Sequence, residues 1–212
     1  MASAGVVVTA AGITKDLGLG AVACGSRRDV RQAAERRGRM KKRLGRIRTL
    51  VRQDRRCRSL VFTGAKPQGT WGHQGAGLAP STILEIRRNF ATAAMIRRPG
   101  GCTTTAFGLT LGFEADPAVS LRAELVQCWM EVARTSAVPR AALERVWGKL
   151  RELISGPRRW SRVRGPMAAV VATIVDLGWV PLKPDEWEDE TGENWQLNLS
   201  SPGVVPLVLK KV

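Results

Sequence analysis

Apolar residues recur every three to four positions over long stretches of the chain, which is the spacing of one face of an α-helix. The first stretch predicts a helix from Asp29 to about Gln53. Ser26 is placed to act as its N-cap, and Asp29 suits its first turn. The apolar positions of this predicted helix are Val30, Ala34, Met40, Leu44, Ile47 and Val51.

The same spacing predicts three helices in the middle of the chain. One begins at Pro80 and is ended by Pro99-Gly100-Gly101, and a short buried helix covers Thr103–Leu111. The third begins at Pro117, because proline suits the first helical position, and runs to about Arg134.

Two more helices follow toward the C-terminus. The first begins at Val138-Pro139, and the second runs from Pro166 to Leu177 and is ended by Gly178. The core positions expected on the helices that begin at Pro117 and Pro139 are Val119, Leu121, Leu125, Trp129, Val132, Leu143, Val146, Trp147, Leu150 and Leu153.

Three stretches depart from the helical pattern. Val6–Thr9 is a short β-type run before a tight turn, and the Gly- and Pro-rich stretch Thr63–Pro80 predicts a loop. Trp187–Trp195 predicts a β-hairpin with its turn near Thr191-Gly192. The whole pattern indicates a mainly α-helical protein with a long basic N-terminal helix and a small C-terminal β-hairpin.

Charge is unevenly distributed along the chain, whose formal net charge is +16. Residues 27–58 hold fifteen Lys and Arg against three acids, and residues 185–193 hold six acids and no Lys or Arg. A solvated helix normally mixes acids with its bases, so this excess indicates a polyanionic partner. Nucleic acid is favoured over a membrane surface, because the apolar face of the first helix lacks Trp, Phe and a run of Leu.

The predicted basic helix supplies the main candidate contacts, since arginine matches phosphate oxygens with a planar fork of donors. The candidate phosphate ligands are Arg27, Arg28, Arg31, Arg36, Arg37, Arg39, Lys41, Lys42, Arg43, Arg46, Arg48 and Arg52. Nothing in the sequence matches a motif that reads bases in the major groove.

A second basic patch precedes the last predicted helix. It consists of Arg158, Arg159, Trp160, Arg162 and Arg164. Basic residues around a tryptophan at a helix N-terminus suit a phosphate with a stacked base. The alternative interpretation is that Trp160 anchors the core and the arginines are solvated.

The remaining chemistry is sparse. The four cysteines, Cys24, Cys57, Cys102 and Cys128, show no zinc-site spacing, and we interpret them as reduced thiols. The single histidine, His73, has no credible catalytic partner in the sequence, so no enzyme is predicted. We expect no cofactor, no metal and no small-molecule ligand. No apolar run is long enough to span a membrane and no signal peptide is evident, so we expect an intracellular protein of the nucleus or cytoplasm.

Several stretches together resemble the region after the catalytic palm of non-LTR retrotransposon reverse transcriptases of the protist type. Thr14–Gly18 is similar to the K-Y-L-G turn of that family, and Lys66–Gln74 is set like its P-x-x-x-Y-G-x-E motif. Asp16 and Trp71 stand where the family has Tyr, and Gln74 where it has Glu. The stretches that resemble the tail after the thumb are Gly101–Thr105, Val163–Met167 and Leu177–Trp179.

The resemblance implies a thumb and post-thumb fragment. Lys15, Asp16, Leu17 and Gly18 would form the primer-grip edge of the palm, and the helices after them the thumb. The catalytic aspartate pair would lie upstream of Met1, so the fragment could not polymerise alone. The segments are then 1–62 (palm edge and basic helix), 63–156 (helical thumb-like region) and 157–212 (basic linker, helix and acidic hairpin).

The sequence thus predicts a non-catalytic fragment that grips the template–primer backbone, with RNA, DNA or an RNA–DNA hybrid as partner. The alternative is a free-standing basic RNA-associated structural protein, ribosomal in character. A small nuclease is a third possibility and requires a metal held by acids such as Asp185 or Glu188. The acidic hairpin could also dock on the basic helix as a mimic of nucleic acid.

Overall fold

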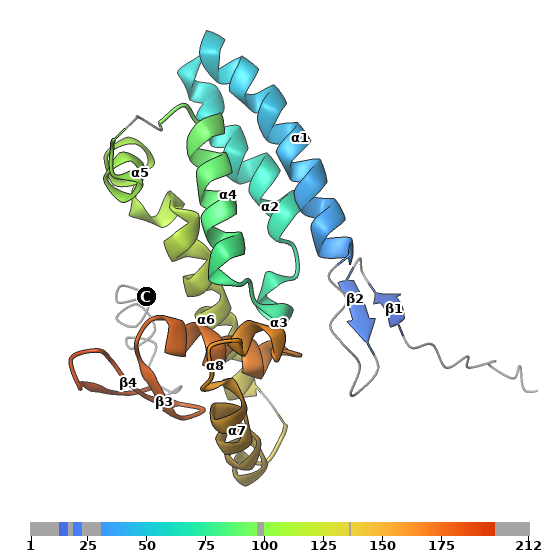
Figure 1. Cartoon of the computed structure of the whole chain (residues 1–212), viewed down its shortest axis with the longest axis vertical. Helices are drawn as coiled ribbons and strands as arrows, with labels where there is room; N and C mark the ends of the chain where they lie inside the picture. The colour runs from blue at the N-terminus through green and yellow to red at the C-terminus, as the bar shows by residue number, and fades with distance from the viewer. Residues whose placement is uncertain (1–12, 17–18, 23–30, 97–99, 136, 198–212) are drawn as a thin grey trace, which may run out of the picture.

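Eight α-helices make up most of the described part of the chain, with a three-stranded antiparallel sheet near its C-terminal end (Figure 1). The computed structural model describes residues 13–16, 19–22, 31–96, 100–135 and 137–197. The predicted fold class, mainly α with a small C-terminal β element, is confirmed. Predictions on Val6–Thr9, Ser26, Asp29 and Pro99 lie outside the described residues.

The α-helices are α1 (Arg31–Gln53), α2 (Lys66–Thr70), α3 (His73–Ala76), α4 (Pro80–Ala93), α5 (Thr103–Leu111), α6 (Pro117–Thr135), α7 (Arg140–Ile154) and α8 (Pro166–Asp176). The strands are β1 (Ile13–Asp16), β2 (Leu19–Val22), β3 (Val180–Lys183), β4 (Glu186–Glu188) and β5 (Asn194–Gln196). Shorter turns are η1 (Arg55–Arg58), the π-helical η2 (Val61–Ala65), η3 (Phe113–Ala115) and η4 (Arg159–Ser161).

Helix α1 packs against α2 and α4 along one narrow face. Its buried residues are Met40, Leu44, Ile47 and Val51, as the periodicity predicts. Ala34 was also expected on this face but is exposed. Burial begins at Met40, so the first two turns of α1 hold no fully buried side chain.

The expectation of a loop over Thr63–Pro80 is wrong, because this stretch holds η2, α2 and α3. Pro67 lies in the first turn of α2, which directly continues the π-helical η2, so the proline does not end the helical chain. Gly69 permits close packing, since a Cβ there would lie 2.1 Å from Met40 Sδ on α1. Gly72 adopts φ +75° at the start of α3, a conformation that favours glycine. Glycine and proline therefore serve helix packing in this stretch.

Helix α5 has the predicted bounds but is not a buried helix. Only Phe107 is buried, and Leu109 is 85% exposed. With only nine residues, α5 places one side chain in the core and presents the opposite face to solvent.

Two clusters of buried side chains form the core, and α6 contributes to both. The first cluster is built from α1, α4 and α5 and includes Leu121 of α6. The second begins at Leu125 of α6 and continues through α7, α8 and the C-terminal sheet. In Figure 1 α6 accordingly runs from the upper helices to the lower ones. Neither cluster coincides with a predicted segment, and the domain boundaries stay a prediction.

Some expected core positions of α6 and α7 face solvent. Val132, Val146 and Leu153 are each more than two-fifths exposed. Trp147 is buried as predicted, and Ile154, which was not predicted, completes the buried stripe of α7. These two residues are seven positions apart, so they lie on one face of the helix.

The predicted C-terminal hairpin is confirmed and gains a third strand. β4 pairs with β5, with Trp187 opposite Trp195, and β3 pairs with β4. The indole N–H groups of Trp129 and Trp147 donate to the carbonyls of Pro184 and Pro181 at 3.0 and 2.9 Å. These bonds fix the sheet to α6 and α7.

None of the helices in the described ranges is both long and apolar enough to cross a membrane.

Candidate nucleic-acid interface

The basic residues of α1 fall on three faces around its buried stripe, as the helical period of 3.6 residues dictates. One face points toward η2 and α2 and carries Arg36, Arg39, Arg43 and Arg46. The opposite face points toward α4 and carries Arg37, Lys41, Arg48 and Arg52. Arg31 lies on the outer face, and Lys42 lies where the outer face meets the face toward α2.

The face toward α2 borders an open groove of about 510 Å³, called here the basic groove. The residues that line it are Arg39, Lys42, Arg43, Arg46, Ile47, Leu50, Leu60 and Gln68. A Cβ at Gly64 would lie 3.0 Å from Arg43 Nη2, so the Arg43 guanidinium extends across the groove onto η2. Four cations thus converge on one hollow with an apolar floor.

The face toward α4 is narrower and partly neutralised. Lys41 forms a salt bridge with Glu85 of α4. Lys41 and Arg48 line a cavity of only about 150 Å³ beside Asn89. The smaller space and the acidic partner make this face a weaker candidate for a phosphate strand than the basic groove.

Several cations of α1 have no acidic partner among the described residues. Arg39 is within 4.0 Å of Glu35, and Arg36 Nη1 donates to the Trp71 carbonyl at 3.2 Å. In the described ranges, no salt bridge is formed by Arg37, Lys42, Arg43, Arg46, Arg48 or Arg52. Arg27 and Arg28 lie outside the described residues.

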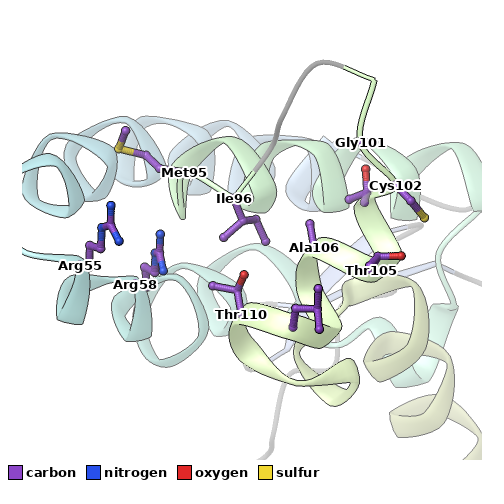
Figure 2. A pocket seen from close by; sticks show the side chains of 11 residues that line it. Arg55, Arg58, Met95, Ile96, Gly101, Cys102, Thr105, Ala106 and Thr110 are labelled. Atoms are coloured by element: carbon purple, nitrogen blue, oxygen red, sulfur yellow. The ribbon is translucent and has the colours of Figure 1, made fainter.

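Arg55 and Arg58 of η1 extend the basic surface and were not among the predicted contacts. They line a cavity of about 480 Å³, and Figure 2 shows both on one side of it with Cys102 and Thr105 on the other. Arg58 Nε donates to the Ala94 carbonyl at 2.9 Å, which joins η1 to the end of α4. In the sequence, only the position of Arg55 and Arg58 at the end of the basic run indicated that they could belong to this surface.

Cys102 precedes the first turn of α5 and is exposed. Hydrogen bonds from the backbone and side chain of Thr105, and then of Thr104, lower the pKa of the thiol to about 7. The opposite holds for Cys128, because burial raises the pKa of that thiol. We therefore expect the two thiols to differ in reactivity, a difference that the sequence did not indicate.

The second predicted patch is held largely by contacts within the protein. Asp176 accepts hydrogen bonds from Trp160 Nε1 at 2.6 Å and from Arg159 Nη1 at 2.7 Å. Arg162 Nη1 donates to the Leu153 carbonyl at 2.7 Å. Trp160 packs against the second core cluster, so the alternative of a core anchor describes it better than a free stacking platform. Arg158 and Arg164 are exposed.

The predicted primer-grip residues are only partly described. Lys15 and Asp16 end β1, which pairs with β2 through a register that sets Asp16 opposite Leu19. Leu17 and Gly18 lie outside the described residues. Figure 1 places this hairpin near the N-terminal end of α1.

His73 is buried and has polar neighbours that the sequence did not indicate. Its Nδ1 donates to the Thr70 carbonyl at 2.9 Å, and its Nε2 lies 3.3 Å from Glu124 Oε2. Lys66 bonds to the same carboxylate and to Ser120 Oγ at 3.1 Å. Burial lowers the pKa of His73 against the opposing effect of Glu124, which favours the neutral ring.

Three acids in or beside the C-terminal sheet, Asp185, Glu186 and Asp189, form ion pairs or hydrogen bonds with residues near that sheet. Asp185 pairs with Arg140 of α7 at 2.8 Å, and Glu186 pairs with Lys183 at 2.6 Å. Asp189 accepts three hydrogen bonds across the turn from Thr191 and Glu193. No salt bridge joins this sheet to α1 within the described ranges, so no contact supports docking of the hairpin on that helix.

In the residues that the structure describes, no group of three or more His, Cys, Asp or Glu side chains could hold a metal ion. Comparisons of the chain with protein-family models, with curated proteins and with solved structures found no match. The main feature of the site is therefore a groove lined by four cations of α1 together with apolar side chains.

Proposed function

We propose that this chain binds nucleic acid through the sugar–phosphate backbone, with the phosphates in the basic groove. The observation that carries the proposal is the convergence of Lys42, Arg43 and Arg46 on one hollow without an acidic partner among the described residues. Cations so close repel each other, and a phosphate strand removes that repulsion. Helix α1 is then the element that holds the strand.

The resemblance described above suggests the biological setting. In that setting the chain is the thumb and post-thumb segment of a retroelement reverse transcriptase and holds an RNA–DNA template–primer without catalysing polymerisation. The alternative, a free-standing RNA-associated protein, uses the same groove. Reading the coding sequence upstream of Met1 separates them, because palm motifs with paired aspartates in the same frame support the first and their absence supports the second.

Fluorescence anisotropy with a labelled RNA–DNA hybrid over a salt series tests the proposal. Each phosphate contact contributes about one unit to the slope of log affinity against log salt concentration. We expect a slope of about −5 or steeper for the wild type, and a loss of roughly three units when Lys42, Arg43 and Arg46 are all changed to Gln.

A matched control removes the same charge elsewhere. Arg134, Arg145 and Lys149 are exposed on α6 and α7 and form no salt bridge within the described ranges. Changing these three to Gln should leave the salt slope close to that of the wild type. If the salt slope of both triple variants became equally shallow, only the net charge would matter and the groove would not be the binding site. Absence of binding by the wild type at low salt would refute the proposed function.

A further inference from the structure

A second cavity lies beside α2, on the other side from the basic groove. It has a volume of about 660 Å³ and combines Phe62, Pro67 and Trp71 with Lys66, His73 and Glu124. Pro67 lines this cavity and the neighbouring Gln68 lines the basic groove, so α2 separates the two. Binding sites for small organic groups combine apolar walls with a few polar groups in this way.

Trp71 supplies an exposed aromatic surface at the mouth of this cavity. The residue is 59% exposed, although most tryptophans of the described chain are buried. Its backbone is fixed, because its carbonyl accepts from Arg36 Nη1 on α1 and Gly72 turns the chain directly after it. An exposed indole on a backbone that is held next to the basic helix suits a flat π-system that arrives with a phosphate strand.

The polar end of the cavity has an excess of acceptors. His73 uses its Nδ1–H on the Thr70 carbonyl, so in the neutral ring Nε2 is an acceptor, and it lies 3.3 Å from Glu124 Oε2. Nε2 is buried and has no hydrogen-bond partner among the described residues. Lys66 donates to only one oxygen of the Glu124 carboxylate, Oε1, and the Glu124 side chain is 35% exposed. A ligand that fits this end therefore brings an N–H donor.

We propose that the cavity binds one unpaired nucleobase of the bound strand, stacked on Trp71 with its exocyclic amino group donating to Glu124. The inference rests on the proposed function, because the basic groove delivers the strand. Cytosine carries its exocyclic amino group at the position where thymine and uracil carry a carbonyl oxygen. A carboxylate accepts a hydrogen bond from the amino group and repels the carbonyl oxygen. The site should thus prefer cytosine to thymine.

The test compares three single-stranded octamers that carry the same number of phosphates. They are oligo(dC), oligo(dT) and an abasic deoxyribose-phosphate strand, and anisotropy measures their affinities at low salt. We expect the wild type to bind oligo(dC) about tenfold more tightly than the abasic strand, the effect of one stacked base. Trp71→Ala should abolish that difference and leave abasic binding unchanged.

Two further variants define the roles of the side chains. Trp71→Phe should keep part of the preference for bases over the abasic strand, because it retains an aromatic face. Glu124→Gln should remove the preference for oligo(dC) over oligo(dT), because an amide accepts from cytosine and donates to thymine. Leu109→Ala, on the exposed face of α5, is the control and should change nothing.

The outcomes separate this inference from the proposed function. If the wild type binds the abasic strand as tightly as oligo(dC), or Trp71→Ala weakens both equally, the base site is refuted while the phosphate groove stands. If no octamer binds at low salt and the hybrid does not bind either, both proposals fail. Circular dichroism of each variant confirms that the fold is retained.

Discussion

Asp116 has no exposed surface, and both oxygens of its carboxylate accept hydrogen bonds. Arg87 Nε and Nη2 donate to Oδ2 at 2.9 and 2.6 Å, and the Ala118 N–H donates to Oδ1 at 2.9 Å. A buried carboxylate needs such partners, because an unpaired buried charge is strongly destabilising. The start of α6 at Pro117 was predictable from sequence. The ion pair between Asp116 and Arg87 of α4 was not, because the two residues are 29 positions apart in the chain.

Cys102 gives a prediction at the scale of one residue. With a pKa of about 7, this thiol should reach half of its maximal alkylation rate near pH 7, because only the thiolate reacts. Cys128 should react more slowly at every pH below its own raised pKa. Site-resolved mass spectrometry after iodoacetamide pulses at several pH values measures both rates.

The cause of the Cys102 shift can be tested in the same assay. Thr105→Val removes one hydroxyl donor and keeps the backbone N–H, so it should move the midpoint upward by part of the shift. A wild-type midpoint at the ordinary alkaline value of a thiol would contradict the hydrogen bonds from Thr104 and Thr105.

At the scale of elements, the close approach of α1 and α2 depends on Gly69. Its missing Cβ leaves room for the Met40 side chain, which is completely buried. This contact fixes the position of α2 and hence of Gln68 and Trp71 on its two sides. The basic groove and the second cavity therefore share one structural support.

Gly69→Ala should lower the free energy of unfolding by roughly 1–3 kcal/mol, as overpacking does in a close-packed core. Gly38→Ala and Gly45→Ala are the matched comparison within α1, since an added Cβ meets no atom within 4 Å at either position. Each should raise the free energy of unfolding by about 0.5–1 kcal/mol. Urea unfolding measures all three, and a neutral Gly69→Ala would contradict the contact with Met40.

The sequence predicted the elements whose apolar spacing is regular. Helices α1, α4, α6, α7 and α8 follow from periodicity together with the prolines and glycines at their ends. Helices α2 and α3 were missed, because glycine and proline indicate a loop unless the neighbouring helix is known. On α7 both Val146 and Trp147 belong to plausible apolar stripes, and only the position of α8 and the sheet decides between them.

At the scale of the whole molecule, charge is segregated in space as well as in sequence. The basic α1 lies in the upper part of Figure 1 and the acidic C-terminal sheet in the lower part. Asp185 and Glu186 pair with Arg140 and Lys183 near the sheet. Among the described residues, no acid of the C-terminal sheet forms a salt bridge with a cation of α1.

The candidate site was predictable in its charge but not in its shape. The run of arginines identified α1 as the basic helix, and composition alone indicated a polyanionic partner. The groove could not be predicted, because η2 and α2 form its other wall and were expected to be a loop. Lys66 and His73 meet Glu124 across more than 50 residues, a contact that only the folded chain creates.

A lysine footprint tests the central account most directly, because it locates the bound strand on the intact chain. Lys42 in the basic groove and Lys149 on α7 are both exposed helical lysines without an acidic partner in the described ranges. The chain is acetylated with and without a saturating RNA–DNA hybrid, and each lysine is quantified by mass spectrometry. We predict that the hybrid slows acetylation of Lys42 several-fold and leaves Lys149 unchanged. Equal protection of both lysines, or an unprotected Lys42 while the hybrid is bound, would contradict the basic groove as the binding site.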